Sequence, residues 1–375
     1  MESPEFYAAL TNRSILDQRF ATSLNKQTTK ILQDLSKWLR ERISREGASI
    51  ASKKRYQALL SDIEKHTAKI YKDITDLYVE QFKGLTYDEA AFVAQSMQSV
   101  VVSGIVVETV SNQRLWSAVV NNPLSVGGNN SFVDFDEMIK EIGENSKKVA
   151  SVISGGYSQG MTLQEMTQRI IGTRAQGYSD GIIDKSRRDA QAIVRTSVTH
   201  IASSARNEIY KQNQNIIWGY TIVATLDTRT SATCRFFDGK TYRYGDSYNP
   251  MPPFHYNCRT QTIAEFDANA LSRKGGTRAA NFKEVGDLKG GKVGQIDAQK
   301  QYYEVLKRQP KSQQDAVLGK ARGLIFRNSG LTAQEFREAL TDRMGKPLTL
   351  SELAAENKKI LDYMQSNSFL SGYLD

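Results

Sequence analysis

The chain has 375 residues, a formal net charge of +9 and a mean hydropathy of -0.48. This length allows two or three domains with a sizeable core. No apolar run reaches about 18 residues, which argues against a membrane-spanning helix. The first ten residues lack the basic and apolar regions of a signal peptide, and two cysteines fit a reducing compartment. We therefore expect a soluble protein made in a cytoplasm, with no membrane partner.

Long amphipathic helices are predicted for the N-terminal third. Apolar residues follow the helical period, and such faces usually pack within one molecule. Gly47, Ala48 and Ser49 predict a break between two helices. We expect His66 to be a packing or surface residue. The two apolar runs are Ile31, Leu32, Leu35, Trp38, Leu39 and Ile43, then Tyr56, Leu59, Leu60, Ile63, Ile70, Ile74 and Leu77.

Four segments share a helix-start pattern in which glutamate follows threonine by three positions. In such a capping box the hydroxyl accepts a hydrogen bond from a free amide, and the glutamate accepts one from the amide of the cap residue. Each cap stabilises a helix by about 1 kcal/mol. The pattern predicts helix starts at Thr86, Thr162, Thr332 and Thr349.

The middle of the chain is predicted to hold a linker, helices and a small β element. Residues 121–131 have the composition of a linker. Strand character is confined to 216–226 and 240–244, with a turn at Asp238-Gly239 between them. The expected fold class is mainly α with a small antiparallel β element, in an elongated multi-part protein with long N-terminal helices. Helices are predicted over 132–152, 162–171 and 190–212, with His200 as a core residue.

Residues 225–259 contain both cysteines and one of the three histidines. Cys234 is followed by His255 after twenty residues, and Cys258 lies three positions further on. The His-x-x-Cys spacing allows two side chains to converge on a metal ion from one turn. A structural zinc site needs a fourth ligand, for which Asp227 or Asp238 could supply an oxygen, whereas an open fourth position would suggest catalysis. Zinc, two buried reduced thiols and a disulfide between the cysteines all remain open.

The order of residues here resembles the phage head morphogenesis domain, the minor head proteins typified by the F protein of phage Mu. The resemblance covers roughly residues 130–265, and many family members carry further thiols at the positions of Ser231 and Thr260. The matching run is Leu226-Asp227-Thr228-Arg229-Thr230, Cys234, Asp238-Gly239-Lys240 and Pro252-Pro253-x-His255-x-Asn257-Cys258-Arg259, preceded by Ala192 to Thr196, Ala202 and Asn207.

The resemblance implies a structural motif rather than a catalytic one. We expect Arg195 to brace the loop through Asp227 or Asp238, and we expect Asp227 and Arg229 to fix it by hydrogen bonds. The residues assigned to the motif are Arg195, Asp227, Arg229, Asp238, Gly239, Pro253, Asn257 and Arg259.

By resemblance, the protein is a structural minor head protein of a tailed phage, not an enzyme. It would be made in the host cytoplasm and sit in the virion head at the portal vertex, where it assists head assembly, genome packaging or DNA ejection. Portal protein and major capsid protein are the expected partners. One alternative is a metal-dependent hydrolase or nuclease using Cys234, His255 and Cys258. Another is a sequence-independent DNA-binding protein.

Most of the excess positive charge lies between residues 270 and 330, which hold 13 Lys and Arg against 5 Asp and Glu. Glycine-rich basic stretches can follow a phosphate backbone, so packaged double-stranded DNA is a further expected partner. A solvated linker is the alternative. The candidate DNA contacts are Arg273, Lys274, Arg278, Lys289 and Lys292.

The chain is predicted to divide into four parts. They are an N-terminal helical region (1–120), the head morphogenesis domain (121–265), a basic glycine-rich linker (266–295) and a C-terminal helical region (296–375).

Overall fold

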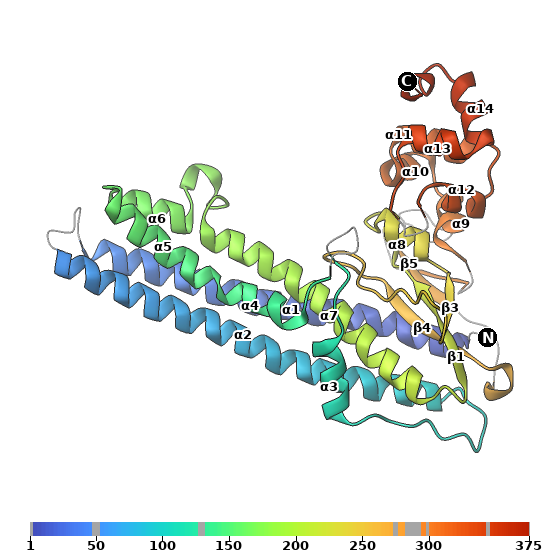
Figure 1. The fold of residues 1–375 in the computed structure, drawn as a ribbon, viewed down its shortest axis with the longest axis horizontal. Coiled ribbons are helices and arrows are strands. Elements are labelled where there is room, and N and C mark those ends of the chain that lie inside the picture. Colours follow the sequence, from blue (N-terminus) through green and yellow to red (C-terminus); the bar gives the residue numbers. More distant parts are fainter. Residues whose placement is uncertain are drawn as a thin grey trace.

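The computed structural model describes seven stretches of the chain and is mainly helical within them (Figure 1). A long helical arm joins a small β region, above which a group of short helices lies. This confirms the predicted fold class. None of the described helices combines the length and the apolar character needed to cross a bilayer. The described residues are 3–46, 53–126, 132–272, 277–281, 294–297, 300–342 and 346–374.

The arm is built from α1 (Pro4–Ser44) and α2 (Lys53–Gln98), which run antiparallel, with α7 (Ile182–Gln212) along them. Both predicted N-terminal helices are confirmed, and both extend beyond the apolar runs that predicted them. The predicted break at residues 47–49 lies outside the described residues. The apolar positions pack into one cluster that includes Leu35, Leu39 and Ile63, so the periodicity marked the true core.

Shorter helices complete the arm: α3 (Asn112–Asn121), α4 (Phe135–Gly143), α5 (Asn145–Ser158) and α6 (Leu163–Ile171). The prediction of one helix over 132–152 was wrong, because the helix is divided at Glu144. The Asn145 side chain donates to the carbonyls of Glu141 and Ile142 and so satisfies the end of α4. Helix α7 also begins earlier than predicted, at Ile182 rather than Ala190.

The main sheet is antiparallel, with the order β3 (Thr241–Arg243), β1 (Ile217–Val223) and β4 (Gln261–Phe266). The predicted strand over 216–226 is interrupted after Val223, because the Ala224 amide donates to the buried Asp238 carboxylate at 2.8 Å. A second sheet pairs β2 (Leu226–Asp227) with β5 (Thr277–Asn281), which also pairs β6 (Gly294–Asp297). The sequence did not reveal β4, which supplies the central strand's second partner.

The C-terminal helices form their own apolar cluster, which includes Phe326, Phe336 and Ile360. Its Leu226 and Tyr302 link it to the β region. The helices are α9 (Tyr302–Lys307), α10 (Lys311–Leu318), α11 (Lys320–Asn328), α12 (Ala333–Ala339), α13 (Leu350–Glu356) and α14 (Lys358–Ser366), and single 3-10 turns lie at Arg174–Gln176, Ala268–Ala270 and Ser371–Tyr373.

Three of the four predicted capping boxes are confirmed, at Thr162, Thr332 and Thr349. The prediction at Thr86 was wrong, because this residue lies inside α2 and its hydroxyl donates to the Phe82 carbonyl. The glutamate of that pattern, Glu89, is fully buried.

Glu89 belongs to an ionic cluster at the base of the arm. Its carboxylate accepts from Arg206 at 2.6 Å and from Arg13 at 2.7 Å. Asp17 lies 3.6 Å from the Arg206 guanidinium, which also donates to Gln261. Burial, with the nearby Glu89 charge, raises the pKa of Asp17 to about 7. The cluster joins α1, α2, α7 and β4 without exposing Arg206 to solvent.

Candidate functional site

The Cys/His loop is assembled from a short helix and the segment before β4. Ser231 caps α8 (Ala232–Phe237) by accepting from the Cys234 amide, which places Cys234 in the first turn. His255 and Cys258 lie between β3 and β4, and the Cys258 amide donates to the His255 carbonyl. Both sulfurs belong to buried residues, with Cys234 2% and Cys258 0% exposed.

The three predicted metal ligands converge. The two sulfurs are 3.7 Å apart, and the Cys234 sulfur is 3.1 Å from Nε2 of His255. All three ligand atoms lie within 4.8 Å of one another. The structure therefore brings together Cys234, His255 and Cys258, which the spacing had predicted.

The His255 ring is oriented by its backbone. Nδ1 is 2.8 Å from the Tyr256 carbonyl, which can only accept, so this nitrogen carries the proton. In the neutral ring, Nε2 then presents its lone pair to the Ser231 hydroxyl, 2.8 Å away, and to the Cys234 sulfur, 3.1 Å away. This is the tautomer that a metal-binding histidine uses. Burial lowers the pKa of His255, but the hydrogen bond with Cys258, in which a protonated Nε2 donates to the thiolate, outweighs burial and raises it.

The thiols titrate as a pair. Burial raises the pKa of Cys258, but hydrogen bonds from Cys234 and His255 outweigh it and hold the pKa well below its ordinary value. The hydrogen bond to Cys258, with burial, raises the pKa of Cys234. Their shared hydrogen bond therefore shifts the pKa values of the two thiols in opposite directions.

Asp227, the fourth predicted ligand, is committed elsewhere. Arg259 binds its carboxylate with both guanidinium nitrogens, at 2.5 and 2.8 Å, and the Arg229 amide donates to it at 3.0 Å. Burial raises the pKa of Asp227, but the Arg259 hydrogen bond and charge outweigh it, so the pKa is lowered. Asp227 is thus an ionised anchor for Arg259 and stands apart from the three clustered ligands.

Arg195 does not make the predicted brace to Asp227 or Asp238. Its side chain is exposed on α7, while the Asp238 carboxylate accepts from the amides of Ala224 and Tyr302 at 2.8 and 2.7 Å. The physical reason is burial: Asp238 is 0% exposed and is satisfied by backbone donors. Asp238 thereby joins the loop to the start of α9.

The remaining motif residues shape the backbone. Gly239 has φ +76°, and an added Cβ would lie 2.9 Å from Gln301. Pro253 follows Pro252 through a cis peptide bond. Asn257 has φ +60°, a region that asparagine tolerates better than most residues.

Sequence reasoning missed two threonines that hold the His-x-x-Cys turn against α7. Thr196 accepts from the Asn257 amide at 3.0 Å, and Thr199 donates to the Cys258 carbonyl at 2.5 Å. Thr196 closes the Ala192–Thr196 run that resembles the family's helix, which was the available signal.

Two buried arginines near the loop were also missed. Arg235 donates to the Thr230 carbonyl at 2.6 Å, and Arg337 donates to the Asp238 carbonyl at 2.8 Å. The available signal for Arg235 was its position before Phe236 and Phe237, where a cation is enclosed by apolar neighbours.

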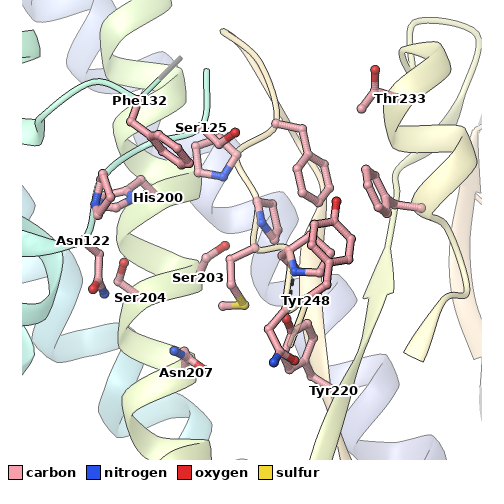
Figure 2. A pocket seen from close by; sticks show the side chains of 18 of the residues that line it. Asn122, Ser125, Phe132, His200, Ser203, Ser204, Asn207, Tyr220, Thr233 and Tyr248 are labelled. Atoms are coloured by element: carbon pink, nitrogen blue, oxygen red, sulfur yellow. Dashed lines mark hydrogen bonds between the residues drawn. The ribbon is translucent and has the colours of Figure 1, made fainter. Parts of the chain in front are cut away.

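A groove of about 1400 Å³ adjoins the loop (Figure 2). Ser203, Ser204 and Asn207 of α7 form one wall, and Tyr220 and Tyr248 lie opposite them. The groove is also lined by Pro250, Met251, Pro252, Pro253 and Phe254, the residues just before His255. No pattern in the sequence predicted this groove.

The candidate DNA contacts are not described by the structure. Arg273, Lys274, Lys289 and Lys292 lie outside the described residues, and Arg278 lies in β5 with its side chain undescribed. Contact with DNA therefore stays a prediction from charge.

Comparisons with curated proteins and with solved structures give no match. A family model does match: the family described as Phage Mu protein F like protein covers residues 147–263, about a third of the chain. The matched stretch contains α7, β1, β3, the first half of β4 and the entire Cys/His loop. Residues 147–263 of this chain are therefore similar to the phage Mu protein F-like domain of head morphogenesis proteins.

Proposed function

We propose that the protein is a structural minor head protein at the portal vertex of a tailed phage, where it assists head assembly, genome packaging or DNA ejection. The observation that carries the proposal is the Phage Mu protein F like match over the segment that builds the loop. The finer roles at the portal rest on this family likeness.

The contacts of the motif support a joint rather than a catalyst. Asp227 holds Arg259, Asp238 holds the start of α9, and Thr199 holds Cys258. The loop thus ties the arm, the main sheet and the C-terminal helices together. Both cysteines are almost fully buried, which leaves little room for a substrate. We therefore rank the metal-dependent hydrolase below the structural role.

The arm is our choice for contacts with the portal and major capsid proteins. Its two long helices extend away from the β region and offer a surface of exposed side chains (Figure 1). Lys26 and Lys30 on α1 and Lys65 on α2 are exposed members of that surface. Residues 266–295, the segment predicted as a basic linker, are our choice for packaged DNA, although β5 and the start of β6 lie within them. The four-part division of the chain stays a prediction.

Purified protein should be captured by immobilised portal protein without DNA, at low and high salt. The triple variant Lys26→Glu, Lys30→Glu, Lys65→Glu should weaken capture, because it reverses three exposed charges without touching the core. The matched control is Phe132→Ser with Tyr248→Ser, which changes two exposed groove residues instead. Loss of capture in this control alone would move the contact from the arm to the groove.

Failure to bind portal or major capsid protein would overturn the proposal. If the protein then bound duplex DNA tightly, with an affinity that falls steeply with salt, the sequence-independent DNA-binding function would replace it. Neutralising Arg273, Lys274, Lys289 and Lys292 should abolish that binding.

A further inference from the structure

We propose that Cys234, His255 and Cys258 bind one zinc ion in a tetrahedral site whose fourth position faces the Ser231 hydroxyl. The ion would fasten α8 to the turn before β4. This proposal concerns the loop itself and does not depend on a role in the phage head.

The spacing of the sulfurs fits a bound ion. Two thiolates at about 2.3 Å from a tetrahedral zinc stand about 3.8 Å apart, and the sulfurs of Cys234 and Cys258 are 3.7 Å apart. A disulfide needs about 2.05 Å, so its formation would require both residues to move. A thiol–thiol hydrogen bond gives a similar separation, so the metal is favoured by the third ligand: a ring nitrogen of His255 lies within 4.8 Å of both sulfurs.

The histidine needs only a small adjustment. A thiolate and an imidazole nitrogen on the same ion stand about 3.6 Å apart, against 3.1 Å between Cys234 and His255. The distance between the Cys234 sulfur and Nε2 is therefore shorter than it would be with a bound ion. A shift of a few tenths of an ångström between the two side chains would make room for the ion. The Tyr256 carbonyl already holds Nδ1, so Nε2, which faces the sulfurs, is the nitrogen that would bind the metal.

The backbone around the ligands is fixed before any ion binds. Thr199 holds the Cys258 carbonyl and Thr196 holds the Asn257 amide, both from α7. Ser231 fixes the first turn of α8 and with it Cys234. Such outer contacts orient metal ligands and raise affinity.

Charge and burial also favour zinc. Two thiolates neutralise a divalent ion, so the loaded site would bury no net charge. Binding would release the remaining thiol proton to solvent. Ser231 offers a fourth donor, since its oxygen is 2.8 Å from Nε2, whereas Asp227 is held by Arg259. A neutral hydroxyl is a weaker ligand than a thiolate, so this site should bind zinc less tightly than a site with three thiolates.

Cobalt substitution tests the site in the full chain. Protein stripped with a chelator under reducing conditions should take up one cobalt ion and gain the visible absorption of tetrahedral cobalt, together with thiolate-to-cobalt charge transfer. Zinc should abolish this spectrum. The variant Cys258→Ser should lose the cobalt spectrum. If this variant does not fold, the variant Ser231→Cys, which adds a ligand instead of removing one, still tests the site.

Ser231→Cys should add a third thiolate, which raises the charge-transfer intensity by about half and strengthens zinc binding. The matched control is Ser247→Cys, which adds an exposed thiol in the groove loop and should leave the spectrum unchanged.

Three results would overturn the proposal. They are no tetrahedral cobalt spectrum in the folded protein, an equal gain in both added-thiol variants, or a protein isolated without zinc whose mass shows the two cysteines oxidised to a disulfide.

Discussion

The far end of the helical arm and its base are held together by different forces, although α1, α2 and α7 run through both. At the far end, aliphatic side chains such as Leu39, Leu59 and Ile63 pack in one cluster. At the base, Arg206 and Glu89 are buried as a charged pair. Truncating an apolar side chain lowers the free energy of unfolding in proportion to the cavity volume it leaves. Removing one partner of a buried ion pair costs more, because the other charge stays buried without a counter-charge. Single substitutions at the base should therefore destabilise the protein more than substitutions at the far end.

The largest effect is expected from Arg206→Ala. It leaves Glu89 and Asp17 buried without their main counter-charge, which should lower the free energy of unfolding by about 3–5 kcal/mol in urea titration. The control is Arg114→Ala, which removes a half-exposed pair with Glu208 and should cost about 1 kcal/mol or less. Equal losses in the two variants would mean that burial does not distinguish them.

Leu39→Ala tests the far end. The side chain is fully buried, so its truncation should cost about 2–5 kcal/mol, with little dependence on salt. Leu39→Met keeps the volume and should cost less than about 1.5 kcal/mol. A large salt dependence of the Leu39→Ala loss would contradict a purely apolar far end.

Asp17 should give the base a pH dependence that the far end lacks. Its folded pKa of about 7 lies above the ordinary value of 3.8, so the folded protein binds more protons between these values. The free energy of unfolding should then fall as the pH rises through this window. Asp17→Asn should flatten that slope. The free energy of unfolding of the variant, compared with that of the parent protein, should therefore be higher near pH 8 than near pH 5, at about 25 °C. Parallel pH profiles would refute the assignment.

The smallest effect is expected at a confirmed cap. Thr162→Ala removes the hydroxyl that accepts from the Glu165 amide and should cost about 1 kcal/mol. Thr22→Ala changes an exposed threonine inside α1 and should stay within about 0.5 kcal/mol. A cap variant no worse than this control would show that α6 does not depend on its capping box.

The sequence by itself determined the features that depend on neighbours a few residues away. Helical periodicity predicted the two long helices, and the Thr-x-x-Glu pattern found the starts of α6, α12 and α13. Residue order also singled out Cys234, His255 and Cys258, which do converge. The helix and cap signals are local, because helix contacts and caps join residues three or four positions apart. The Cys/His signal came from residue type, since Cys234 and His255 lie 21 positions apart.

Only the tertiary structure decided which distant groups are paired. The Thr86–Glu89 pattern matches the true caps, yet Glu89 meets Arg206, 117 positions later, and the helix continues through it. Asp227 is bound by Arg259 rather than Arg195, and Asp238 by the Tyr302 amide. The reason is that a buried charge or carboxylate pairs with whichever donor the packed elements bring close to it. The spacing of residues along the sequence does not predict which donor that is.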